Sequence, residues 1–212
     1  MLVIFDCDGV LVDTEAASSE AIAGFFTRLR APVSAEECRK LFQGMPMEDI
    51  CRQMTERAGI ANDPSLPKQV RSCVEHALAD VSAPIPGVAD LLEVLKTKGI
   101  PVCVGSSGSV RKMRMTLGNA NLLSHFGDRL FSGQDVSRGK PAPDVFLAAA
   151  AAMGIACEEA VIIEDSVVGV RAGVASGARV LGYAGDPHVD ADALAAAGAE
   201  VFYRMEEVPG LI

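Results

Sequence analysis

Short apolar runs alternate with longer stretches of helical periodicity through most of the chain. Apolar runs of roughly four to eight residues are typical of buried strands, and apolar positions at helical spacing are typical of helices. The predicted strands are Leu2–Phe5, Pro101–Gly105, Leu130–Phe131, Ala160–Ile163, Arg179–Gly182 and Val201–Tyr203. The predicted helices between them are Gly87–Lys98, Arg111–Leu117, Pro143–Met153 and Val168–Ser176. Because these strands are continuously apolar, they indicate a Rossmann-like α/β fold, a parallel sheet with helices on both faces.

One region departs from this alternation. Between Thr14 and about Ala83 the pattern contains helical signals and no convincing strand. The helices predicted there are Ser18–Arg30, Ala35–Phe42, Met47–Ala58 and Leu66–Asp80. The proline-rich segment Ala83–Gly87 then predicts a hinge. The sequence therefore predicts an α/β core of residues 1–13 and 84–212, with a helical domain of residues 14–83 inserted after the first strand.

The composition is that of a globular protein, and it narrows the range of partners. The 212 residues are 50% apolar and 22% charged, which suits one or two packed domains. Lys and Arg number 19 and Asp and Glu number 28, so the net charge is −9. That charge argues against nucleic acid and anionic membranes as partners, because both need basic patches. No apolar run approaches the roughly 20 residues that a membrane span requires.

The first residues and the cysteines predict a cytoplasmic protein. The chain starts without a basic leader and runs into acidic residues, so we expect no signal peptide. The six cysteines are scattered, without a CxxC motif or a histidine at metal-ligand spacing. We therefore expect reduced thiols in the core, with a disulfide framework as the alternative.

The first predicted strand is followed at once by Asp6-Cys7-Asp8-Gly9. Residues two apart on leaving a strand point to the same side, so Asp6 and Asp8 can converge on one ligand. Two carboxylates in one site can divide the work, one as nucleophile or metal ligand and the other as acid. Taken alone, however, an acidic pair more often simply ends a strand in a turn.

Three further segments carry candidate residues. Ser106 and Ser107 end another strand before a helix, where hydroxyls and backbone N–H groups can bind an anion. Lys140 precedes two prolines and can balance negative charge, while Glu164-Asp165 follows the most apolar strand and can bind a hard cation such as Mg²⁺. Each segment also has a purely structural interpretation. The serines can form a capped turn, Lys140 can be an ordinary surface lysine, and Glu164-Asp165 can cap the next helix. All four segments lie at the carboxyl ends of predicted strands, where open α/β sheets bind ligands.

These four segments, in this order, resemble the motifs of the haloacid dehalogenase superfamily, in its cap-bearing phosphatase and phosphomutase branch. Asp6-x-Asp8-Gly-Val-Leu-Val-Asp-Thr is similar to the first motif, and Ser106 to the second. Lys140 in K-P-x-P-D is similar to the third motif, and Glu164-Asp165-Ser166-x-x-Gly169 to the fourth. The stretch Gly99–Gly182 most resembles sugar-phosphate phosphatases of the 6-phosphogluconate type.

The resemblance implies a role for each residue that would meet the phosphate. Asp6 would attack phosphorus and carry an aspartyl-phosphate intermediate. Asp8 would protonate the leaving alcohol and then deprotonate the hydrolytic water. Ser106 and the Ser107 amide would hold phosphate oxygens, while Lys140 would compensate their charge. Phosphoryl transfer asks mainly for such positioning and charge stabilisation.

The resemblance also implies a metal and a cap. Mg²⁺ would be held by Asp6, by the backbone carbonyl of Asp8 and by Asp165. Glu164 would act through water or as a supporting acid.

Residues 14–83 would form a mobile cap that closes over the site and helps to choose the leaving group. Gly44, Met45 and Met47 lie in the loop that resembles the substrate-reading segment of relatives. The alternative for the two methionines is packing in the core of the cap.

The implied function is a Mg²⁺-dependent phosphatase, monomeric, that hydrolyses a small phosphorylated metabolite such as a sugar phosphate or phosphosugar acid. A phosphomutase of the β-phosphoglucomutase type is the alternative. Those enzymes typically place a histidine in the first cap helix and an arginine in the substrate loop, whereas this chain has Ser18 and Met47 or a neighbour there. A 2-haloacid dehalogenase would not need Asp8 and Asp165, and a catalytically silent binding module would need none of the set.

Overall fold

A computed structural model describes the chain except for residues 43, 44, 62 and 82. The chain divides into two compact units. One consists of Met1–Asp13 and Ser82–Ile212, and the other of Thr14–Val81.

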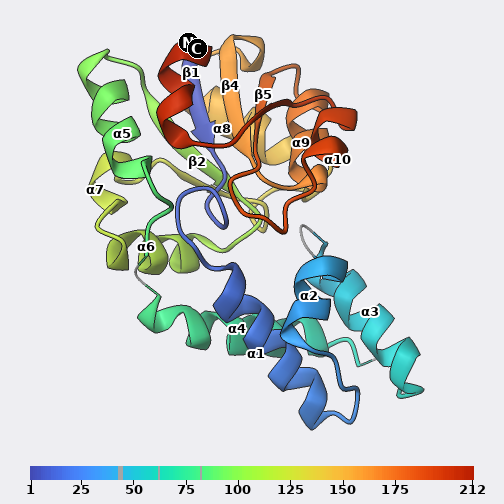
Figure 1. The fold of residues 1–212 in the computed structure, drawn as a ribbon. Coiled ribbons are helices and arrows are strands. Elements are labelled where there is room, and N and C mark those ends of the chain that lie inside the picture. The colour runs from blue at the N-terminus through green and yellow to red at the C-terminus, as the bar shows by residue number, and fades with distance from the viewer. Residues whose placement is uncertain (43–44, 62, 82) are drawn as a thin grey trace. The chain divides into compact units, whose positions relative to one another are not determined.

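The first unit is built on a six-stranded sheet in which every pair of neighbouring strands is parallel (Figure 1). The strand order is β3-β2-β1-β4-β5-β6. The strands are β1 Leu2–Phe5, β2 Val102–Ser106, β3 Leu130–Ser132, β4 Ala160–Glu164, β5 Arg179–Tyr183 and β6 Glu200–Phe202. Every predicted strand is present with ends shifted by no more than one residue. The α/β prediction of a parallel Rossmann-like sheet is therefore confirmed.

Helices cover both faces of this sheet. They are α5 Val88–Thr97, α6 Val110–Asn119, α7 Leu123–Phe126, α8 Asp144–Ala152, α9 Val167–Ala175, α10 Ala191–Ala196 and α11 Val208–Leu211, with 3-10 turns at Cys157–Glu159 and Met205–Glu207. On one face Ile4 packs into the apolar cluster that contains Phe146 of α8. On the other face Phe5 meets Phe126 of α7 edge-on, with ring centroids 6.1 Å apart. Successive side chains of β1 thus pack into the apolar layers on opposite faces of the sheet, which is why the strand is apolar at every position.

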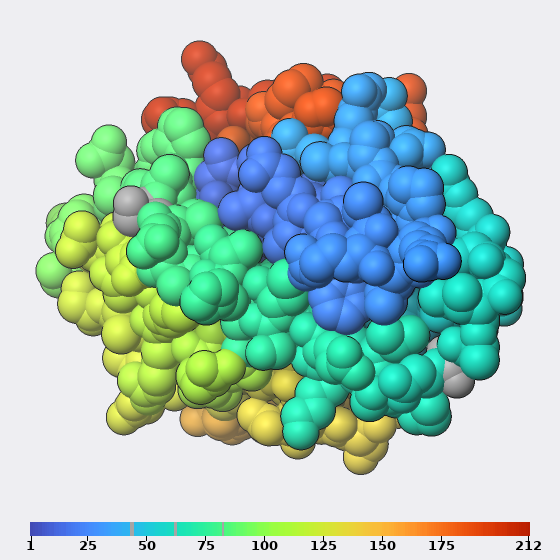
Figure 2. All heavy atoms as spheres, turned by 90° about the horizontal axis from the view of Figure 1, so that it is seen from below, coloured from blue at the N-terminus to red at the C-terminus, as the bar shows by residue number. Residues whose placement is uncertain are grey.

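The second unit is helical throughout the part that the structure describes. It contains α1 Glu15–Arg28, α2 Ala35–Phe42, α3 Met47–Ala58, α4 Leu66–Ala77 and a 3-10 turn at Leu78–Asp80. In the surface view of Figure 2, α1 is drawn in blue and packs against α4. The buried residues Ile22, Phe26, Met54, Val70 and Leu78 form its interior. None of the described helices is both long and apolar enough to cross a membrane.

The chain leaves and re-enters the first unit along two adjacent segments. The Asp13 N–H donates to the Ala83 carbonyl at 3.0 Å, and the Ile85 N–H donates to the Leu11 carbonyl at 3.0 Å. Val12 and Pro84 form an antiparallel bridge between these bonds. Ala83 therefore belongs to the first unit, whereas the sequence pattern placed it in the inserted domain.

We predict that Gly173→Ala destabilises the protein, because α9 packs too closely on the sheet for a methyl group. A Cβ at Gly173 would lie 2.7 Å from Cγ2 of Val180 and 3.3 Å from Cδ1 of Ile162. Overpacking of this kind lowers the free energy of unfolding by about 1–3 kcal/mol. Gly118→Ala in α6 is the matched control, because its Cβ would meet nothing within 4 Å. That change should stabilise the helix by about 0.5–1 kcal/mol. Urea unfolding in which both variants shift in the same direction would contradict the prediction.

Candidate active site

Three of the predicted site segments lie at the carboxyl ends of adjacent strands. Asp6 follows β1, Ser106 ends β2 and Glu164 ends β4, and β1 lies between the other two. The strand order reverses at β1, because the chain builds β2 and β3 on one side of it and β4 to β6 on the other. The carboxyl edge at such a point is where doubly wound sheets bind ligands.

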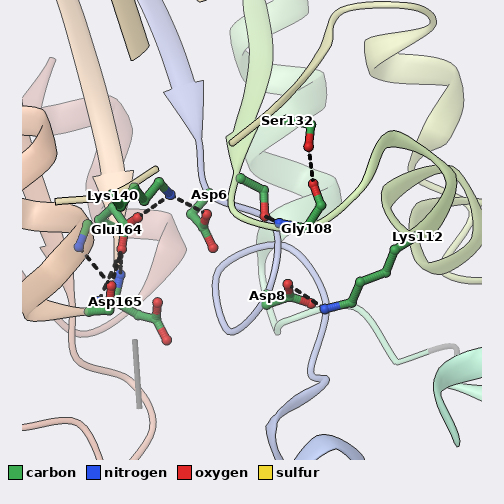
Figure 3. A network of polar contacts seen from close by, with 11 residues as sticks. Asp6, Asp8, Gly108, Lys112, Ser132, Lys140, Glu164 and Asp165 are labelled. Atoms are coloured by element: carbon green, nitrogen blue, oxygen red, sulfur yellow. Dashed lines mark hydrogen bonds and ion pairs between the residues drawn. The ribbon is translucent and has the colours of Figure 1, made fainter. Parts of the chain in front are cut away.

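A buried lysine joins two of these strand ends. The Lys140 ammonium lies 2.6 Å from Oδ1 of Asp6 and 2.6 Å from Oε1 of Glu164 (Figure 3). The exposed fractions of the three side chains are 4% for Lys140, 10% for Asp6 and 1% for Glu164. Its Nζ also lies 4.7 Å from the centre of the Phe146 ring, a cation–π contact. The lysine is thus a fixed cation at the predicted nucleophile and not the surface residue of the alternative interpretation.

Glu164 is held by its own loop. Its Oε2 accepts hydrogen bonds from the backbone N–H groups of Asp165 and Ser166, each at 3.1 Å, and from the Ser166 hydroxyl at 3.0 Å. Ser166 caps α9 by accepting from the Gly169 N–H at 3.0 Å. A Cβ at Gly169 would lie 1.8 Å from Oε1 of Glu164, so only glycine leaves room for this carboxylate. The fourth sequence segment is therefore a scaffold that aims Glu164 at Lys140.

Burial and the neighbouring charges change the acidity of this group of side chains. Burial is the largest influence on Asp6 and, with Glu164 and Asp8 adding to it and Lys140 opposing it, raises its pKa from 3.8 to about 7. Burial lowers the pKa of Lys140, but Asp6 and Glu164 outweigh it and raise that pKa above the ordinary value. Burial, followed by Asp8 and Asp6, also raises the pKa of the Cys7 thiol well above its ordinary value. Lys140 is therefore a permanent positive charge, while Cys7 is a poor thiolate.

Asp8 is paired with a lysine that the sequence reasoning did not select. The Lys112 ammonium lies 2.8 Å from Oδ2 of Asp8, and both side chains are about one-fifth exposed or less. Lys112 is in the first turn of α6, where its N–H donates to the capping hydroxyl of Ser109 at 3.2 Å. Figure 3 shows the two side chains reaching toward each other from the loop after β1 and from α6. The signal available in the sequence was a basic residue one turn after the Ser106–Ser109 loop.

The Ser106–Ser109 loop is braced by the segment after β3. The Ser132 hydroxyl donates to the Gly108 carbonyl at 2.8 Å, and the Gly133 N–H donates to the Ser106 carbonyl at 2.7 Å. The Ser106 hydroxyl is buried and accepts from the Gly108 N–H at 3.2 Å, whereas Ser107 is exposed. A rigid turn with hydroxyls and N–H groups at a helix start is suited to phosphate oxygens.

Comparison with known proteins assigns the family. Residues 3–183 match the haloacid dehalogenase-like hydrolases. The chain belongs to this family. It is 34% identical to the 6-phosphogluconate phosphatase of Escherichia coli K12 over 88% of this chain and 83% of that protein. It is 29% identical to the phosphorylated carbohydrates phosphatase of Thermotoga maritima over 97% of this chain and 95% of that protein. The resemblance stated from the motifs is thereby confirmed, and so is the prediction of an enzyme of this superfamily.

Solved structures of haloacid dehalogenase-like proteins share the fold. One of unknown function from Agrobacterium tumefaciens is 36% identical, with a TM-score of 0.85 over 99% of this chain and 96% of that chain. A β-phosphoglucomutase from Clostridium difficile has a TM-score of 0.81 at 17% identity, over 98% of this chain and 92% of that chain. At that identity the second likeness concerns the fold alone, so it does not separate a phosphatase from a mutase.

The donor atoms around the Asp6–Asp8 loop of this haloacid dehalogenase-like hydrolase suit a hard cation. Asp165 approaches the loop so closely that a Cβ at Gly9 would lie 2.2 Å from its Oδ2. Gly9 has a φ of +72°, so the loop needs glycine there both for space and for backbone conformation. Mg²⁺ usually takes one or two carboxylates and completes its shell with waters and phosphate oxygens, so Asp6, Asp165 and the Asp8 carbonyl fit it in kind. Among the residues described, no group of three or more His, Cys, Asp or Glu residues could hold a metal ion by itself.

The substrate-loop candidates lie in the helical unit. Gly44 is outside the described residues. Met45 and Met47 are half-buried, and the Met45 sulfur accepts a hydrogen bond from Gln53 Nε2 at 3.4 Å. Within their own unit the two methionines are therefore not fully buried core residues. All six cysteines are free thiols, and five of them are buried while Cys73 is half-buried.

We predict that Lys140→Met lowers the free energy of unfolding by about 3–5 kcal/mol, because it leaves two carboxylates buried without a counter-charge. Adding Glu164→Gln should recover part of that loss, since it removes one of the two unpaired charges. Lys40→Met is the control: Lys40 pairs with Glu36 at 2.8 Å, but both side chains are more than half exposed. Its cost should stay within about 0.5 kcal/mol. Equal costs for the two lysines in urea unfolding at neutral pH would show that Lys140 is not the counter-charge described.

Proposed function

We propose that this protein is a Mg²⁺-dependent phosphatase that hydrolyses a small phosphorylated metabolite through an aspartyl-phosphate intermediate. The observation that carries the proposal is the buried Lys140 cation held against Asp6, next to the Ser106–Ser109 loop and the Asp8–Lys112 pair. A carboxylate beside a fixed cation, with an anion-binding turn and a second carboxyl group nearby, contains the parts that phosphoryl transfer requires.

In the first half-reaction a carboxylate oxygen of Asp6 attacks phosphorus. The bond from phosphorus to the ester oxygen breaks, its electron pair goes to that oxygen, and Asp8 supplies the proton that turns it into the free alcohol. Lys140 carries charge next to Asp6 throughout, and the Ser106 hydroxyl and Ser107 N–H hold the non-bridging phosphate oxygens.

In the second half-reaction Asp8, now a carboxylate, takes a proton from a water molecule whose oxygen attacks phosphorus. The acyl-phosphate bond breaks, Asp6 regains its carboxylate and inorganic phosphate leaves. Asp8 is protonated again, which restores the starting state of the enzyme.

The cation would be held by the Asp6 and Asp165 carboxylates and by the backbone carbonyl of Asp8. Glu164 would contribute indirectly, by holding Lys140 in place through their ion pair. When bound, Mg²⁺ supplies positive charge to the phosphate and lets a dianion approach the acidic residues. This need is supported by the raised pKa of Asp6, which shows that burial and its acidic neighbours disfavour the ionised carboxylate.

We infer that the substrate is a sugar phosphate or a phosphosugar acid, since two similar enzymes are phosphatases of 6-phosphogluconate and of phosphorylated carbohydrates. In this proposal the helical unit is a cap that takes part in choosing the leaving group, with Gly44, Met45 and Met47 as its contact candidates. We further propose that the protein is a cytoplasmic monomer and that it binds neither nucleic acid nor membranes.

We predict that Asp6→Asn abolishes hydrolysis of every substrate the wild-type enzyme accepts, because an amide oxygen cannot form the phosphoenzyme. The assay is phosphate release from a panel of sugar phosphates, sugar-acid phosphates, phosphoglycolate and nucleotides with Mg²⁺, and chelation with EDTA should remove the activity. An unchanged circular dichroism spectrum serves as the control for folding. Well-folded wild-type protein that releases phosphate from no member of the panel would refute the proposed function.

Incubation with β-glucose 1-phosphate separates the proposal from a phosphomutase, the activity of the fold neighbour described above. We predict free phosphate as the product, because Ser18 and Met47 or a neighbour stand where mutases of this type typically have a histidine and an arginine. Formation of glucose 6-phosphate without phosphate release would make the protein a mutase.

A further inference from the structure

We propose that Lys112 is a positioning residue, which holds the Asp8 carboxyl group so that Asp8 can serve the leaving-group oxygen; the inference rests on the proposed phosphatase function. The ammonium of Lys112 is 2.8 Å from Oδ2 of Asp8, although the two residues are 104 positions apart in the chain. A contact between such distant segments comes from the fold and not from local geometry.

The backbone of Lys112 is fixed before its side chain reaches Asp8. Its N–H is bound by the capping hydroxyl of Ser109 at 3.2 Å, and its carbonyl accepts from the Thr116 hydroxyl at 3.2 Å. The side-chain stem runs along Gly108, where a Cβ would lie 3.3 Å from Cδ of Lys112 and 3.8 Å from Oδ2 of Asp8. Rotamer freedom is the main cost of holding a lysine in one place, and these contacts reduce it.

Gly108 also places the Lys112–Asp8 pair next to the Ser106–Ser109 loop. A Cβ at Gly108 would also lie 3.6 Å from the Ser106 hydroxyl. The side chains of Lys112, Asp8 and Ser106 therefore all lie close to the Gly108 Cα. Lys140 lies instead on Asp6 and Glu164. Each of the two aspartates therefore has its own lysine, one for the nucleophile and one for the residue that handles the leaving group.

This division predicts a selective defect. Asp8 matters most when the leaving group is an alkoxide, which needs a proton, and least when it is p-nitrophenolate, a far weaker base. The specificity constant kcat/KM covers only the steps up to release of the alcohol, so it isolates this half-reaction. A mispositioned Asp8 should lower kcat/KM for an alkyl phosphate much more than for p-nitrophenyl phosphate.

The test measures kcat/KM of Lys112→Met with two probes: the alkyl phosphate that the wild-type enzyme hydrolyses best in the panel above, and p-nitrophenyl phosphate. We expect a loss of about 10- to 100-fold for the alkyl ester, no more than about 3-fold for the aryl ester, and substantial recovery of the alkyl activity in Lys112→Arg. Arg114→Met is the matched control, because it removes the same charge from the same helix at an exposed ion pair with Asp128. It should change neither rate.

The ratio of the two specificity constants does not depend on how much of the variant is folded, since both probes report the same active fraction. Equal losses on the two esters, or no loss on either, would overturn the role of Lys112 while leaving the phosphatase function in place. A wild-type enzyme that hydrolyses neither probe would instead refute the proposed function, and this inference with it.

Discussion

The structure of the core unit depends on one buried cation. Lys140 is 4% exposed and lies between the carboxylates of Asp6 and Glu164, which are 10% and 1% exposed. An unpaired charge in such a place would be strongly destabilising, so both carboxylates need Lys140 as their counter-charge. The Phe146 ring and the N–H groups of the loop after β4 complete their surroundings. The attraction to Lys140 that holds these side chains together thus also favours the ionised Asp6 carboxylate, against the opposing influence of burial and of Glu164.

That constraint reaches into the fold, because the three charges come from separate parts of the chain. Asp6 follows β1, Glu164 ends β4, and Lys140 lies between β3 and α8. The charges can meet only if β1 and β4 are neighbours, as the order β3-β2-β1-β4-β5-β6 provides. Position 169 must also be glycine, because the Glu164 carboxylate occupies the space that a side chain there would need. A small residue in a helix is therefore explained by a charge pair at the end of a strand.

The sequence predicted most of the fold and most of the charged residues of the site, but not how those residues pair. The strands were found within one residue, because a buried parallel strand is apolar at every position and is followed by polar residues. The short helices α7, α10 and α11 were not predicted, since a stretch of six residues or fewer shows too little of a helical period. Asp6, Lys140 and Glu164 were candidates from their motifs, but only the structure shows that Glu164 faces Lys140. Lys112 was missed because a basic residue one turn after the Ser106–Ser109 loop does not by itself indicate a partner 104 residues away.

The pairing of each aspartate with a lysine bears on how an acidic protein can receive an anion. The net charge of −9 repels a phosphate ester at long range, but at physiological ionic strength that repulsion is screened beyond about 8 Å. Inside that distance the local charges decide, and they are Lys140 beside Asp6 and Lys112 beside Asp8. These two ammonium groups offset only part of the negative charge of the acidic residues around the site, which include Glu164 and Asp165. A bound divalent cation is the simplest group that offsets them, so the pattern of charges favours a metal-dependent phosphatase over one that relies on lysines alone.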